Sequence, residues 1–369
     1  MNGVRIRRIL QTAILPAVIL ILGGLLTGFA GCAKPSAELV TAGTGAPVYA
    51  SYRDIPGITA EEEAAIETLK KRYGGFTLAM LHTTEAFYRD DGTIGGFTSL
   101  FCDWLTGLFG VPFKPDIVEW EALIEGLASR GIDFTGELTA TPERRKIYHM
   151  TDAIAERSIR YFRLAGDESL SELAARRQLR FAFLEGATTG GDVREVTDES
   201  FVSTYVKNYG EAVVLLRDGT VDAFFAESPA EAAFAEYGDI TTAEYFPLIY
   251  SPVSLTTGNP ELVPIISVVR KYLDRGGIYH LTELYNRGED DYRKYKLFRQ
   301  LTEEEQAYIR ARRDGQEIPI AAEYDNYPFC FYNAAERQWQ GIAIDVLGEI
   351  GALSGLSFTV TNEPGASWP

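Results

Sequence analysis

The chain has 369 residues, 46% of them apolar and 12% aromatic, with a formal net charge of −17. At roughly 100–200 residues per domain, this length predicts about two structural units. The negative charge would repel phosphate backbones, so we expect no nucleic-acid partner. Three cysteines and three histidines, without CxxC or HExxH spacing, argue against a disulfide framework or a metal site, and we expect no cofactor.

The first segment, residues 1–32, begins with three arginines and continues without charge, which predicts an export signal. The uncharged stretch exceeds the ~20 residues that span a bilayer. It ends in Phe-Ala-Gly-Cys32, which resembles a bacterial lipobox and implies a lipid on Cys32. The alternative is an uncleaved transmembrane helix. Both interpretations anchor the chain in a membrane and place the remainder outside the cytoplasm.

Residues 33–72 are predicted to form a tether and a linking helix. In the helix, Thr59 and Glu62 have the spacing of a capping box, in which the two side chains satisfy the first backbone amides. A second linking helix is expected in 301–315, where Thr302 and Glu305 repeat this spacing.

Between the two linking helices, residues 73–300 alternate apolar strands and amphipathic helices. The predicted strands are 76–81, 113–119, 132–136, 158–164, 179–184, 222–226 and 246–255. The predicted helices are 97–109, 120–130, 142–147, 169–177, 198–208, 210–218, 228–236, 260–275 and 277–285. Such alternation favours an α/β fold with mostly parallel strands and with ligands at their carboxyl ends.

Part of this pattern recurs later in the chain. After each capped helix come an apolar strand, a loop with two aromatic residues, a glycine that opens a helix (Gly96 and Gly341), another strand and a Trp (Trp120 and Trp368). Such a recurrence predicts a duplicated unit. The second copy, 316–369, stops after its Trp, so we expect it to be the start of an incomplete second domain of a longer protein.

One motif resembles a known family. The segment Asp133-Phe-Thr-Gly-Glu-Leu-Thr139-Ala-Thr141-Pro-Glu143-Arg144 is similar to the first-lobe signature of family 3 bacterial solute-binding proteins. The resemblance implies a two-lobed, periplasmic-binding-protein-like (type II) clamshell, each lobe a mixed sheet flanked by helices. Lobe 1 would comprise about 73–160 and 250–300, and lobe 2 about 161–249.

The resemblance also implies a ligand-carboxylate site. Arg144 would hold the carboxylate with its planar guanidinium fork. Thr139 would bind the same group with its hydroxyl and amide. From the second lobe, Thr188 would add a hydroxyl at a helix N-terminus.

Three further residues complete the predicted site. Glu227 stands where the family places an acid that binds the ligand ammonium, although an acid before Ser228-Pro229 also suits a helix start. Trp120 would line the cleft or pack in the lobe 1 core. Glu137 replaces a family glycine, and it would favour a cationic ligand.

The expected function is therefore binding of a small amino-acid-like solute between hinged lobes. The duplicated unit resembles the sensor regions of hybrid histidine kinases, which implies the sensory part of a membrane receptor with a downstream signalling domain. The alternative is a lipoprotein that delivers solute to the permease of an ABC-type amino-acid transporter. A dehydratase-type enzyme would need an acid and a base in the cleft, and Glu227 and Glu137 are the only suggestive pair. Because a pair of carboxylates alone is not evidence of catalysis, we expect none by this chain.

Overall fold

The computed structural model describes residues 40–41, 47–197, 200–313 and 315–366. The predicted signal segment with Cys32, most of the tether and Trp368 lie outside the described residues. Within the described ranges there is no helix with the length and apolarity that crossing a membrane requires.

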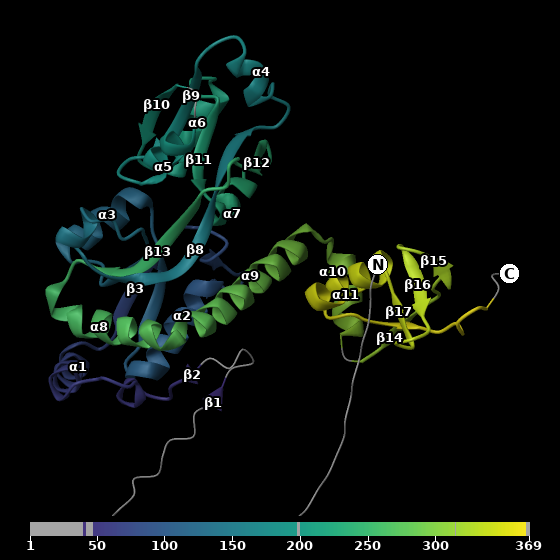
Figure 1. Ribbon diagram of the computed structural model, residues 1–369, viewed down its shortest axis with the longest axis horizontal. Helices are drawn as coiled ribbons and strands as arrows, with labels where there is room; N and C mark the ends of the chain where they lie inside the picture. Colours follow the sequence, from purple (N-terminus) through teal and green to yellow (C-terminus); the bar gives the residue numbers. More distant parts are fainter. Residues whose placement is uncertain (1–39, 42–46, 198–199, 314, 367–369) are drawn as a thin grey trace, which may run out of the picture. The chain divides into compact units, whose positions relative to one another are not determined.

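A mixed sheet runs through the domain (Figure 1), and in the described part of the chain it has nine strands in the order β10-β9-β11-β8-β13-β7-β3-β6, with β12 also paired to β8. These strands are β3 (Phe76–Met80), β6 (Phe113–Ile117), β7 (Phe134–Leu138), β8 (His149–Leu164), β9 (Leu179–Leu184), β10 (Phe201–Val206), β11 (Ala223–Glu227), β12 (Ile240–Glu244) and β13 (Tyr250–Thr257). The fold is therefore the expected mixed sheet flanked by helices.

Strand β8 connects two lobes. Its first part pairs with β13, from His149 to Ser158, and its last part pairs with β11 and β12. The prediction of a strand over 158–164 was therefore too short. Lobe 1 contains β3, β6 and β7, and lobe 2 contains β9 to β12, so β8 and β13 are the crossover strands.

Helices cover the sheet in both lobes (Figure 1). In lobe 1 they are α2 (Phe97–Phe109), α3 (Trp120–Ser129), α8 (Val263–Tyr272) and α9 (Ile278–Gln300), and in lobe 2 they are α4 (Leu170–Ala174), α5 (Thr189–Val196), α6 (Tyr209–Arg217) and α7 (Glu231–Ala235). The short strands β1 (Val40–Thr41) and β2 (Pro47–Val48) precede α1 (Ala60–Arg72). The predicted capping box of α1, between Thr59 and Glu62, is present.

The predicted helix 198–208 was wrong, because Phe201–Val206 is strand β10, parallel to β9. Its sequence, Phe-Val-Ser-Thr-Tyr-Val, is rich in the β-branched and aromatic residues that suit a pleated, half-buried surface. The predicted helix 142–147 is a single 3-10 turn, Arg144–Lys146, and α9 continues well beyond the predicted end at 285.

One apolar cluster extends across both lobes. Leu81, Trp120 and Leu138 of lobe 1 belong to the same buried cluster as Leu184 and Phe224 of lobe 2. Separate clusters fill each lobe behind it. The facing surfaces of the lobes are therefore packed against each other in this structure.

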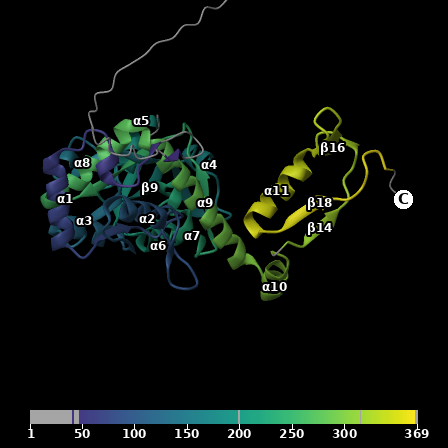
Figure 2. The ribbon, with the colours of Figure 1, turned by 90° about the horizontal axis from the view of Figure 1, so that it is seen from below.

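Residues 302–360 follow the order of elements of residues 59–117, with one additional short strand, β15. The elements are α10 (Glu303–Arg312), β14 (Glu317–Ile320), β15 (Asp325–Asn326), β16 (Cys330–Asn333), β17 (Gln338–Gln340), α11 (Ile342–Ser354) and β18 (Ser357–Val360). Figure 2 shows α11 lying along β14 and β18, which are parallel, as β3 and β6 are. The β16–β17 ladder corresponds to the hairpin β4 (Phe87–Tyr88) and β5 (Ile94–Gly95).

Each of these two segments opens its helix with a glycine in a conformation that other residues rarely adopt. Gly96 has φ 88° before α2, and Gly341 has φ 114° before α11. A Cβ at Gly96 would lie 2.5 Å from the carbonyl oxygen of Glu85, and one at Gly341 would lie 2.7 Å from that of Phe329. Both positions therefore require glycine for the same reason, a close backbone approach at positive φ.

Candidate functional site

The two lobes of the domain are joined by several contacts besides the crossover strands. The amide of Thr84 donates to the carbonyl of Pro229 at 2.8 Å. The Trp120 indole nitrogen donates to the carbonyl of Glu185 at 2.7 Å. These bonds place the lobes in a closed arrangement.

Arg144 lies between the lobes at the 3-10 turn that follows β7. Its Nη1 donates to the Thr139 carbonyl at 3.1 Å in lobe 1, and its Nη2 donates to the Gly186 carbonyl at 2.9 Å in lobe 2. Its backbone amide donates to the Thr141 hydroxyl at 3.2 Å, so Thr141 caps this turn. Burial lowers the pKa of Arg144, and Glu227 opposes this effect. No carboxylate among the described residues forms an ion pair with this guanidinium.

Glu227 ends β11 in lobe 2 and is partly buried. It occupies the N-cap position of the next turn, but its side chain makes no capping bond. Burial raises the pKa of this carboxyl, Arg157 and Arg144 lower it, and Glu137 raises it. The carboxylate of Glu227 therefore lies within the electrostatic reach of Arg144.

Thr139 belongs to lobe 1 and Thr188 to lobe 2, the two lobes that Arg144 bonds. The Thr139 hydroxyl is 3.1 Å from the Ser251 hydroxyl of β13. Thr188 is the N-cap residue of α5 but makes no capping bond with its side chain. The nearby Asp192 carboxyl has a pKa that burial raises and that the Thr188 side chain and Arg144 lower.

Trp120 is buried at the start of α3, within the cluster that both lobes share. Its indole nitrogen bonds lobe 2 through Glu185, as described above. The residue therefore lies at the junction of the lobes and not only in the lobe 1 core.

Glu137 lies in the buried strand β7, and its two oxygens already have protein partners. Oε1 accepts from the Leu81 amide at 2.9 Å, and Oε2 accepts from Arg157 at 2.6 Å. Arg157 also bonds Glu85, through Nε at 2.8 Å and Nη2 at 2.6 Å. A cationic ligand could contact Glu137 only if Arg157 moved away.

Arg157 and Glu85 were not predicted from the sequence. The predicted strand began only at 158, whereas β8 begins at His149 and places Arg157 two residues before Ile159 on the same, buried face. A charged residue in such a position requires a buried partner of opposite charge. The sequence does not show which acids provide it.

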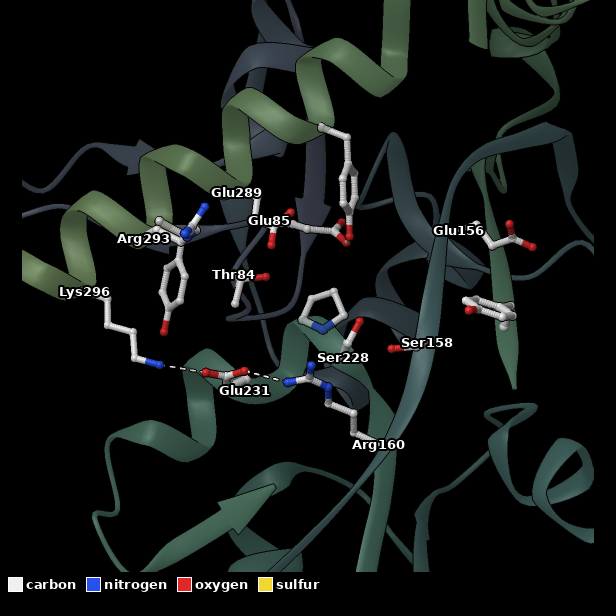
Figure 3. A pocket seen from close by; sticks show the side chains of 14 residues that line it. Thr84, Glu85, Glu156, Ser158, Arg160, Ser228, Glu231, Glu289, Arg293 and Lys296 are labelled. Atoms are coloured by element: carbon white, nitrogen blue, oxygen red, sulfur yellow. Dashed lines mark hydrogen bonds and ion pairs between the residues drawn. The ribbon is translucent and has the colours of Figure 1, made fainter. Parts of the chain in front are cut away.

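A cavity of about 340 Å³ lies between the lobes beside α9 (Figure 3). Its walls carry Glu85 and Tyr285 from lobe 1 and Ser228 from lobe 2. Across one side, Glu231 bridges Lys296 at 2.7 Å and Arg160 at 2.8 Å (Figure 3). None of the six residues predicted to bind ligand lines this cavity.

Around Arg144, by contrast, the predicted site residues gather from both lobes. Thr139 is bonded to it directly, and Glu227 acts on it electrostatically. Thr188 is connected to it through Asp192. Contact of these residues with a ligand stays a prediction.

Comparison with protein families gives one match. The model of the bacterial extracellular solute-binding proteins, family 3, matches residues 78–287. No curated protein matches the chain.

Several solved structures are similar over part of the chain. An ancestral amino acid-binding protein, AncCDT-1, described as a precursor of cyclohexadienyl dehydratase, is 18% identical, with 60% of this chain and 98% of that chain covered and a TM-score of 0.47. The substrate-binding protein AbpA of an amino acid ABC transporter from Streptococcus pneumoniae, bound to L-arginine, is 15% identical, with coverages of 61% and 98% and a TM-score of 0.48. Holo ArgBP from T. maritima is 19% identical, with coverages of 57% and 93% and a TM-score of 0.45.

Proposed function

The chain belongs to the bacterial extracellular solute-binding proteins, family 3, and we propose that its interlobe site binds an amino acid or a related zwitterion. The family supports a solute-binding domain outside the cytoplasm. The chemistry of Arg144 and Glu227 supports the zwitterion.

The observation that carries this proposal is that the Arg144 guanidinium has only neutral hydrogen-bond partners. It is partly withdrawn from water, yet it bonds only the carbonyls of Thr139 and Gly186. Neutral carbonyls are weaker partners for a guanidinium than a carboxylate, which forms charge-assisted, bidentate bonds. A ligand carboxylate would therefore gain by replacing these carbonyls, and it would contact both lobes at once.

Glu227 supports the other half of the zwitterion. A ligand ammonium would give this buried carboxylate the close opposite charge that it lacks. Because Arg144 comes from lobe 1 and Glu227 from lobe 2, one zwitterion would pair with both lobes. It would then bind the closed arrangement better than an open one and shift the population toward closure.

Arg144→Ala tests the proposal by titration calorimetry with the twenty L-amino acids. Truncating one partner of a buried, hydrogen-bonded charge pair costs about 2–5 kcal/mol, so we expect the best ligand to bind roughly 30-fold or more weakly. Lys146→Ala, at an exposed position in the same turn, is the matched control and should bind like the parent. Equal affinity of the Arg144→Ala variant and the parent would show that Arg144 does not hold the ligand.

We further propose that the domain is the sensory part of a membrane receptor, of the kind found in hybrid histidine kinases, and that 316–369 begins a second domain. The element order shared by 59–117 and 302–360 supports this role, since a transport binder needs only one unit. The anchor would be residues 1–32, through Cys32 or a membrane helix. The alternative is the lipoprotein of an amino-acid transporter.

The DNA that follows the codon for Pro369 separates these roles. Sequence that completes the second domain and continues into an apolar span and a signalling domain is the expected result. A stop codon followed by permease genes would contradict the sensor and favour the transporter.

We also propose that the domain binds its solute without converting it. Glu227 and Glu137 were the only pair that suggested acid–base chemistry, and Glu137 is held by Arg157 and by the Leu81 amide. A carboxylate with both oxygens bonded in this way is poorly suited to transfer protons to a substrate.

A further inference from the structure

The most buried charged group of the domain joins the crossover strand to lobe 1. The Arg157 side chain, on β8, is 2% exposed, and its partners Glu85 and Glu137 are 4% and 3% exposed. Glu85 comes from the loop after β3, and Glu137 comes from β7. Glu85 also accepts from the Tyr285 hydroxyl at 2.8 Å. Two carboxylates and one guanidinium are thus enclosed together, with an excess of one negative charge.

This cluster adjoins the proposed ligand site. Glu137 precedes Thr139 by two residues, and Thr139 bonds Arg144 through its carbonyl. Glu85 lines the interlobe cavity of Figure 3. The carboxyl of Glu227 has a pKa that burial raises and that Arg157 lowers, so these two groups interact across the lobes. The cluster therefore borders the interlobe cavity through Glu85, and Arg157 lies within electrostatic reach of Glu227.

The two carboxylates have the arrangement of a cation-binding position. Both oxygens of Glu85 accept from one guanidinium, and Glu137 accepts from the remaining terminal nitrogen. Fork-shaped contacts of this kind select planar cations. In this chain the cation is Arg157 itself, and displacing it would leave a charge buried without a partner, which is strongly unfavourable.

We propose that Arg157 determines ligand specificity by filling the cation-binding position beside the cleft, so that the ligand has no basic side chain. This inference rests on the proposed function, with Arg144 and Glu227 as the groups that hold the zwitterion. It identifies the ligand class as neutral or acidic amino acids and related zwitterions.

The first test is calorimetry on the unaltered chain with the twenty L-amino acids. We expect a neutral or acidic amino acid to bind and arginine and lysine to bind at least about 100-fold more weakly, which corresponds to roughly one uncompensated buried charge. Arginine or lysine as the tightest ligand would overturn the specificity proposal and leave the proposed zwitterion site intact. Absence of binding by every amino acid would overturn both.

The second test asks directly whether Glu85 and Glu137 form a cation site. In Arg157→Ala, ethylguanidinium chloride should raise the melting temperature in a saturable way at millimolar concentration, relative to sodium chloride at the same ionic strength. The parent, whose position is filled, is the matched control and should show no such rise. Glu137→Gln combined with Arg157→Ala should weaken the response severalfold.

If ethylguanidinium raises the melting temperature of Arg157→Ala no more than that of the parent, the proposal is overturned. If this variant does not fold, the arginine and lysine titrations of the unaltered chain decide the question alone.

Discussion

Two partly buried side chains near the junction of the lobes, Arg144 and Glu227, form no ion pair within the described residues. Arg160, by contrast, is paired with Glu231 and with Glu244. Keeping a charge partly buried without a partner is unfavourable, so proteins retain such charges mainly where they have a function. This contrast supports the proposal that the ligand binds at Arg144, and it indicates that the ion pairs of Arg160 stabilise the fold.

Glu227→Gln should separate stability from binding. Because burial raises the pKa of this carboxyl above its ordinary value of 4.5, its proton stabilises the fold fully below that value. This stabilisation is lost as the pH rises through the raised pKa of the folded state. At neutral pH the variant without ligand should therefore melt at a higher temperature than the parent, while its affinity for a zwitterion should fall about tenfold or more.

The pH dependence of ligand affinity provides the control. The parent should lose affinity as the pH falls through the raised pKa of Glu227, because the ammonium requires an ionised Glu227. Calorimetry of Glu227→Gln over the same range should show a flatter profile. A pH profile unchanged by the substitution would contradict the assignment of Glu227 to the ammonium.

For individual residues, local motifs predicted some features of the site but not the acids that pair with the buried Arg157. The Thr-x-Thr-Pro-Glu-Arg spacing predicted a helix at Arg144, and the structure has a single 3-10 turn there, with Thr141 bonded to the Arg144 amide. The network of Arg157 with Glu85 depends on three separate strands and loops meeting in space. No spacing along the chain specifies which acid meets Arg157.

At the scale of elements, helix α9 of lobe 1 borders the cavity and contacts lobe 2. Lys296 of α9 bonds Glu231 of α7, which also bonds Arg160 of β8 (Figure 3). On the same helix, Tyr292 packs with Phe87 of lobe 1 and Ala232 of lobe 2. These contacts hold the lobes closed in addition to any ligand.

Lys296→Met should therefore favour an open arrangement and weaken ligand binding. The pair with Glu231 is partly exposed, so its contribution is about 0.3–1 kcal/mol, or roughly a two- to fivefold loss of affinity by calorimetry. Lys294→Met, on the exposed face of the same helix, is the control and should have no effect. Equal affinities for all three proteins would mean that this contact does not stabilise closure.

The elements were predicted correctly where a long segment followed one period, and wrongly where the apolar segment was short. Helix α2 was predicted with its observed bounds, since thirteen residues follow one amphipathic period between two glycines. Strand β10 was predicted as a helix, because a six-residue segment buried at both ends is too short to distinguish the helical period from the strand period. Its identity is fixed by pairing with β9, which is a tertiary contact.

For the whole molecule, the central feature is that one apolar cluster and several hydrogen bonds already join the two lobes. A ligand therefore adds to closure and does not create it alone. The mixed sheet continues through β8 and β13, so these two strands are the natural hinge between lobes that otherwise have their own cores. Opening would separate Arg144 from the Gly186 carbonyl and give a ligand access to both Arg144 and Glu227.

A crystal structure of the chain with its tightest-binding amino acid tests this account most directly. We predict that the ligand carboxylate takes the place of the Gly186 carbonyl on the Arg144 guanidinium, with the ligand ammonium on Glu227 and with Arg157 still bonded to Glu85. A ligand bound in the cavity beside α9, or one that leaves Arg144 on the Thr139 and Gly186 carbonyls, would contradict it.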